Sequence, residues 1–151
     1  MSTVKLTIPI QAPIERVWET VMDPSHFQDW VTIHRGVKSV SPQPLKPGAT
    51  MDQVLCLRGV NFHVHWTLVE VKAPENACWE GKGPAHSRAL IRYQLSADGD
   101  DATMFSYTNE FTPPGGLLGN AASRVLVGDL SEREAHKSLD RLKALLEQTS
   151  G

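Results

Sequence analysis

Three side chains that can transfer protons are the candidates for catalysis in this sequence: Glu132, Tyr107 and His34. Glu132 interrupts the apolar side of a C-terminal segment with helical periodicity. Desolvation favours the protonated form of a carboxyl group in an apolar cavity. That form suits general acid/base chemistry or the binding of a polar ligand group. The alternative is that Glu132 lies at a rim, paired with a strand arginine such as Arg88 or Arg92, as exposed acids commonly are.

Tyr107 and Asn109 are predicted to be polar points in an otherwise apolar wall. They alternate with Phe105 and Phe111 along one strand, so all four side chains point to the same face. In a cavity they could hydrogen-bond a carbonyl or hydroxyl group of a ligand. The alternative is that Tyr107 is satisfied by a neighbouring backbone group.

Three tryptophans, Trp30, Trp66 and Trp79, are predicted ligand contacts, because each combines a large apolar ring with one hydrogen-bond donor. Trp30 ends a short helix that can close a cavity, so we expect it to lie at the cavity entrance. The alternative is that Trp30 packs in the core. Trp18 is assigned to the core on the apolar side of the first helix.

No metal site or cofactor is predicted. His63 and His65 share a strand face and could hold a metal with a third ligand such as His34 or His86. However, the more apolar face of that strand carries Phe62, Val64, Trp66 and Leu68, which places both histidines on the outer face. The sequence has no GxGxxG, P-loop or GxSxG motif.

Composition narrows the classes of partner. The chain has 151 residues and a net charge of −2, with scattered Lys and Arg, so nucleic acid is not expected. No apolar run approaches the roughly 20 residues that cross a bilayer, and the N-terminus lacks the pattern of a signal peptide. We therefore expect a cytoplasmic protein without integral membrane association. Cys56 and Cys78 form no disulfide or metal motif.

The elements that position these residues begin with a strand over Val4–Ile10 and a helix that starts at Ala12-Pro13. Asp23-Pro24-Ser25 breaks this helix, and a short helix runs from His26 to about Trp30. Six strands separated by turn signals follow: Gly36–Val40, Thr50–Leu57, Phe62–Lys72, Ala77–Lys82, His86–Ser96 and Ala102–Phe111.

The last element is a long helix from Gly115 to about Gln148. At the helical advance of roughly 100° per residue, its apolar side carries Ala121, Val125, Gly128, Ala135, Leu139, Leu142 and Leu146. The order predicts an α+β fold: a curved antiparallel sheet of about seven strands around this helix. Two small helices after the first strand close the gap between sheet and helix. We therefore expect a single domain over residues 1–151 with an internal cavity.

Several segments in this order resemble the START-like superfamily with the helix-grip fold, also called the SRPBCC or polyketide cyclase/dehydrase and lipid transport superfamily. The opening Ile10-Gln11-Ala12-Pro13-Ile14-Glu15-Arg16-Val17-Trp18 is similar to that of the family. The stretch from Asp23 to Trp30, the connection from Val71 to Glu75 and the terminal helix after a Pro/Gly loop also fit. The segments from Trp30 to His34 and from Gly59 to Thr67 resemble an actinobacterial subgroup, some of whose members are toxins of type II toxin–antitoxin pairs.

This resemblance implies three functions. The first is binding or carriage of a small hydrophobic or amphipathic molecule, lipid-like or polyketide-like, in the cavity. The second is a polyketide aromatase/cyclase, with Glu132, Tyr107 and His34 as candidate catalytic residues. The third is a toxin that acts through a protein partner. The resemblance implies a small apolar ligand and no cofactor, and a homodimer is left open.

Overall fold

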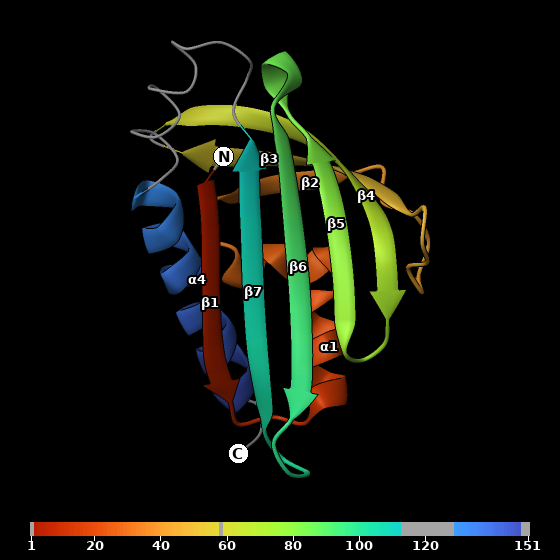
Figure 1. Ribbon diagram of the computed structural model, residues 1–151, viewed down its shortest axis with the longest axis vertical. Helices are drawn as coiled ribbons and strands as arrows, with labels where there is room; N and C mark the ends of the chain where they lie inside the picture. The colour runs from red at the N-terminus through yellow and green to blue at the C-terminus, as the bar shows by residue number, and fades with distance from the viewer. Residues whose placement is uncertain (1, 58, 113–128, 149–151) are drawn as a thin grey trace.

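A seven-stranded antiparallel sheet with helices on one side forms the architecture (Figure 1). A computed structural model describes residues 2–57, 59–112 and 129–148 of the chain. The strand order is β1-β7-β6-β5-β4-β3-β2, so each strand from β2 to β7 lies beside its sequence neighbour, and β1 closes against β7. This confirms the predicted helix-grip fold. The strands are β1 (Ser2–Ile10), β2 (His34–Lys38), β3 (Thr50–Leu57), β4 (Val60–Lys72), β5 (Asn76–Lys82), β6 (Arg88–Ala97) and β7 (Thr103–Thr112).

The alternation of side chains along each strand puts one set against the helices and the other outside. On β4, Trp66 and Leu68 are buried whereas His63 and His65 are exposed, which confirms the predicted parity. The first of the six consecutive strands begins earlier than predicted, at His34 rather than at Gly36. It ends at Lys38 because Ser39 adopts a left-handed backbone with φ 55°.

The small helices follow the predicted breaks. Helix α1 (Ile14–Val21) begins directly after Pro13, which is its N-cap residue rather than part of its first turn. A 3₁₀ turn, η1 (Pro24–His26), then precedes α2 (Phe27–Trp30). The Asp23 carboxylate caps this turn by accepting hydrogen bonds from the Ser25 N–H at 3.0 Å and the Ser25 hydroxyl at 2.7 Å. A second 3₁₀ turn, η2 (Pro84–His86), joins β5 to β6.

Helix α4 (Asp129–Gln148) lies on the same side of the sheet as α1 and contacts β1 and α2 (Figure 1). Leu139, Leu142 and Leu146 are buried on its inner side, as the periodicity predicts. Its last turns are tied to the end of β1, because Lys143 Nζ donates to the Pro9 carbonyl at 2.8 Å. The predicted start of the helix at Gly115, with Ala121, Val125 and Gly128, lies outside the described residues.

Candidate ligand-binding site

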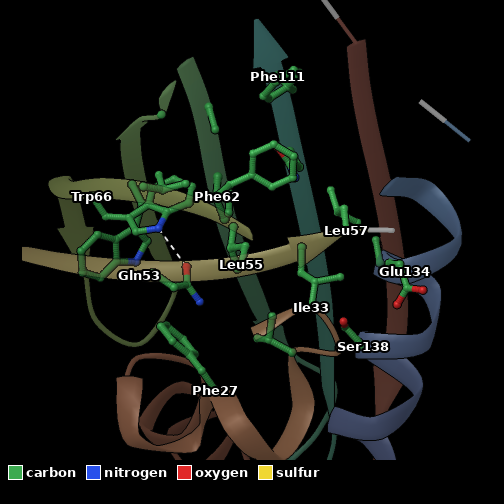
Figure 2. Close-up of a pocket in the computed structure, with 18 of the residues that line it drawn as sticks. Phe27, Ile33, Gln53, Leu55, Leu57, Phe62, Trp66, Phe111, Glu134 and Ser138 are labelled. Carbon is green, nitrogen blue, oxygen red and sulfur yellow. Dashed lines mark hydrogen bonds between the residues drawn. The ribbon is translucent and has the colours of Figure 1, made fainter. Parts of the chain in front are cut away.

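A cavity of about 380 Å³ lies between the curved sheet, α2 and α4 (Figure 2). Its volume falls within the range of small-molecule sites, roughly 300–1,000 Å³. Most of its wall is aliphatic or aromatic. The apolar lining residues are Phe27, Trp30, Val31, Ile33, Met51, Leu55, Leu57, Phe62, Val64, Trp66, Trp79, Pro84, Ala89, Ile91, Phe111, Ala135 and Leu139.

Five of the ligand-binding residues predicted from the sequence line this cavity: Trp30, Trp66, Trp79, Tyr107 and Asn109. Trp30 is 1% exposed and belongs to the core, so it is a buried wall residue and the prediction that it lies at an entrance was wrong. Trp18 packs against the core outside the cavity wall. The three tryptophans can therefore report on the cavity by fluorescence.

Glu132 does not line the cavity; its side chain is exposed on the first turns of α4. The prediction of a cavity carboxylate at this position was therefore wrong. Glu132 precedes Leu139 by seven residues, close to two helical turns, so helical periodicity gives both residues nearly the same direction. Leu139 is nevertheless buried and Glu132 exposed. Periodicity gives that direction, but it does not show which element lies opposite.

The carboxyl group that does line the cavity belongs to Glu134, which Figure 2 shows beside Ser138 on α4. Its carboxylate accepts a hydrogen bond from the Thr32 hydroxyl and lies 3.6 Å from Lys137 Nζ. The Thr32 N–H donates to Ser138 Oγ at 3.0 Å. These bonds connect the segment between α2 and β2 to α4 beside the cavity.

Gln53 joins the cavity wall to His34 by two hydrogen bonds. The Trp66 indole N–H donates to Gln53 Oε1 at 2.9 Å (Figure 2). The Nε2 amide group of Gln53 donates a hydrogen bond to His34 Nδ1, also at 2.9 Å. His34 therefore stands behind the wall, against the ring of Phe27 at 5.7 Å, rather than in the cavity as a catalytic base would. Sequence reasoning missed Gln53, although a polar residue between Met51 and Leu55 on an apolar strand face was the available signal.

Lowering the pH below 6.5 is expected to destabilise the protein through His34. Burial lowers the pKa of His34 from its ordinary value of 6.5. Between that lowered value and 6.5 the unfolded chain binds more protons than the folded one, so stability is present above 6.5 and is lost as the pH falls. A proton on Nδ1 would also remove the acceptor of the Gln53 amide.

Urea unfolding at pH values on both sides of 6.5 measures this effect. His34→Gln should reduce the pH dependence, whereas His63→Gln, at an exposed position on β4, should leave it unchanged. An unchanged slope in His34→Gln would contradict the assignment.

Both tyrosines of the chain, Tyr93 and Tyr107, lie in the wall on β6 and β7. Burial raises the pKa of both, that of Tyr107 to about 12, so the phenols are protonated at neutral pH. Two buried polar atoms among the described residues lack a hydrogen-bond partner, Trp30 Nε1 and Asn109 Oδ1. Both belong to residues that line the cavity, so the unmet hydrogen-bonding capacity of the described interior is concentrated there.

Within residues 2–57, 59–112 and 129–148, no group of three or more His, Cys, Asp or Glu side chains is placed to hold a metal ion. On β4, His63 and His65 are exposed, and His65 Nδ1 pairs with Asp52 Oδ1 at 2.7 Å. No helix of the described part of the chain is long and apolar enough to cross a membrane.

Comparison with known proteins agrees with this geometry. Residues 1–147 match the model of a family described as polyketide cyclase / dehydrase and lipid transport. One relative, Toxin Rv0910 of Mycobacterium tuberculosis, is 28% identical over 83 residues. These residues are 55% of this chain and 58% of that protein, so the chain spans only somewhat more than half of that relative's length.

Solved structures with the same fold include the Zhui aromatase/cyclase from Streptomyces sp. R1128. It has a TM-score of 0.82 and 15% identity, and the match covers 99% of this chain and 95% of that one. A START superfamily protein from Mycobacterium smegmatis has a TM-score of 0.72 and 14% identity, and covers 99% of both chains. At these identities the likeness shows the fold.

Proposed function

Since this chain belongs to the polyketide cyclase / dehydrase and lipid transport family, we propose that it binds or carries a small hydrophobic or amphipathic molecule. The observation that supports the proposal is the cavity of about 380 Å³ with a mostly apolar wall. Moving apolar ligand surface from water into such a wall is favourable by roughly 25 cal/mol per Å². The few polar side chains of the wall would then orient the ligand.

An aromatase/cyclase is the second candidate, favoured by the likeness to the Zhui enzyme over nearly the whole chain. A cyclase must remove and return protons at a carbon skeleton, which requires a base in contact with the ligand. The phenols of Tyr93 and Tyr107 stay protonated, and the Glu134 carboxylate is engaged by Thr32 and Lys137. This arrangement supports binding better than proton abstraction.

The remaining alternatives stay predictions. A toxin function is favoured only by the relative of which the chain spans about half the length. A location in the cytoplasm and a homodimer are expectations from the sequence, as is the lack of a nucleic-acid partner. A growth assay with the expressed chain tests the toxin function directly.

Filling part of the cavity is expected to weaken ligand binding without unfolding the protein. Ala89 lines the cavity on β6, so Ala89→Phe should lower the affinity for the apolar dye N-phenyl-1-naphthylamine by at least about tenfold. Ala97→Phe, at an exposed position on the same strand, is the matched control. Quenching of tryptophan fluorescence gives the affinity, since Trp30, Trp66 and Trp79 line the cavity.

Failure of the dye to bind the wild-type chain, or equal binding to Ala89→Phe, would refute the proposal. Solvent extraction and native mass spectrometry of freshly purified protein would in addition show the mass of a naturally bound molecule.

A further inference from the structure

The two tyrosines of the chain face each other across neighbouring strands in the cavity wall. Tyr93 on β6 is the direct register partner of Tyr107 on β7, and their ring centroids are 6.2 Å apart with planes inclined by 32°. Tyr93 is only 4% exposed. Cross-strand partners on one face keep their side chains adjacent, so the two phenols form a pair.

The other neutral polar groups of the wall mostly have partners. Gln53 binds both Trp66 and His34, and the Ser138 hydroxyl accepts from the Thr32 N–H. The Tyr pair differs. The Tyr107 oxygen accepts a hydrogen bond from Asn109 Nδ2 at 3.2 Å, which leaves the phenol proton as a further donor.

The Tyr93 hydroxyl forms no hydrogen bond with the described residues, and its ring packs in the core beside Trp30, Phe105 and Tyr107. The side chain is almost completely buried, so the described residues leave the hydrogen-bonding capacity of this hydroxyl unused. Since Tyr93 lines the cavity, that capacity is available to a bound ligand.

The charges of the wall indicate that the group bound there is neutral. Among the described residues, Arg88 is the one basic side chain that lines the cavity, and it is exposed at the start of β6. A carboxylate buried beside the phenols would lack a buried cation, which is costly. Two neutral O–H donors suit an oxygen that can accept two hydrogen bonds, such as a carbonyl.

We infer that Tyr93 and Tyr107 together donate hydrogen bonds to a carbonyl oxygen of an uncharged ligand that is otherwise apolar. This inference rests on the proposed function, because it names the chemical class that the same cavity selects. The phenol pair then determines specificity. It raises the affinity for a ligand with a ketone, ester or lactone oxygen and leaves the affinity for a purely apolar molecule unchanged. Asn109 is a positioning residue, because it acts on the ligand through the Tyr107 hydroxyl.

Three matched probes test the inference: 2-acetylnaphthalene carries a ketone, 2-ethylnaphthalene has no oxygen, and 2-naphthoate carries a carboxylate. We expect the wild-type protein to bind the ketone about tenfold more tightly than the hydrocarbon, and the carboxylate most weakly. Tyr93→Phe and Tyr107→Phe should each weaken ketone binding by several-fold, roughly the value of one hydrogen bond, with little change for the hydrocarbon. The double variant should lose the preference for the ketone.

Ser138→Ala is the control, because Thr32 engages this cavity hydroxyl twice: the Thr32 N–H donates to Ser138 Oγ at 3.0 Å, and Thr32 Oγ1 forms a hydrogen bond with the same Oγ at 3.2 Å. It should leave the ratio of the two affinities unchanged. Equal losses for ketone and hydrocarbon in the tyrosine variants, or tightest binding of the carboxylate, would overturn the inference. If 2-ethylnaphthalene binds the wild-type protein and Ala89→Phe prevents this binding, the proposed function stands. This holds even when 2-acetylnaphthalene binds no more tightly than 2-ethylnaphthalene, a result that refutes only the role of the tyrosines. If no probe and no dye binds, both are refuted.

Discussion

Leu142→Ala is expected to lower the free energy of unfolding by about 2–5 kcal/mol, the range for leucine truncation in a packed core. Leu142 is 0% exposed on the inner side of α4 and does not line the cavity. Alanine there would leave a new void inside packed structure. The loss should appear as a lower midpoint of urea unfolding at an unchanged m-value.

Leu139, one turn earlier on the same helix, provides a matched comparison. It is 1% exposed but lines the cavity, so its truncation enlarges a space that already exists. We expect Leu139→Ala to alter the affinity for N-phenyl-1-naphthylamine, and Leu142→Ala to leave that affinity unchanged in the folded protein. A loss below about 1 kcal/mol at Leu142 would contradict the packing of α4 against the sheet.

Strand parity was the strongest part of the sequence prediction, because alternation depends only on local backbone geometry. On β4 it separated Trp66 and Leu68 from the exposed His63 and His65, and on β7 it placed Tyr107 and Asn109 in the wall. The turn signals between successive strands also predicted antiparallel neighbours from β2 to β7, whereas the pairing of β1 with β7 joins segments that are distant in the sequence.

Contacts between distant segments could not be predicted in the same way. Thr32 meets Glu134 and Ser138 across more than a hundred residues, and no local pattern indicates that pairing. The error at Glu132 has the same origin, since the helical period does not show where along α4 the sheet and α2 stand opposite. The sequence did not indicate Tyr93 as a ligand-binding residue, because its importance depends on Tyr107 in the neighbouring strand.

Gly81 determines how closely one tryptophan lies against the sheet, and thereby how much of the cavity stays open. Gly81 on β5 is the register partner of Trp66 on β4. A Cβ atom at this glycine would lie 2.6 Å from Trp66 Cζ3 and 2.8 Å from Val64 Cγ1. Both distances are well below van der Waals contact, so the indole would have to move away from the sheet.

Gly81→Ala is therefore expected to cost about 1–3 kcal/mol of stability, as overpacking of a core typically does. Because Trp66 lines the cavity, its movement should also weaken the binding of N-phenyl-1-naphthylamine and strain the hydrogen bond to Gln53. Gly36→Ala is the control: a Cβ atom there has nothing within 4 Å. Since the Gly36 backbone does not require a positive φ, alanine should be neutral or slightly stabilising.

Urea unfolding and dye titration of the two glycine variants separate packing from a general effect of removing glycine from a strand. Equal stability and equal dye affinity in Gly81→Ala and Gly36→Ala would show that the Trp66 indole does not pack against Gly81. Lower stability and weaker dye binding in Gly81→Ala, but not in Gly36→Ala, would show that the cavity depends on the absence of a side chain at Gly81. In that case the indole of Trp66, held by Gln53 on one side and unopposed by Gly81 on the other, sets the wall of the cavity.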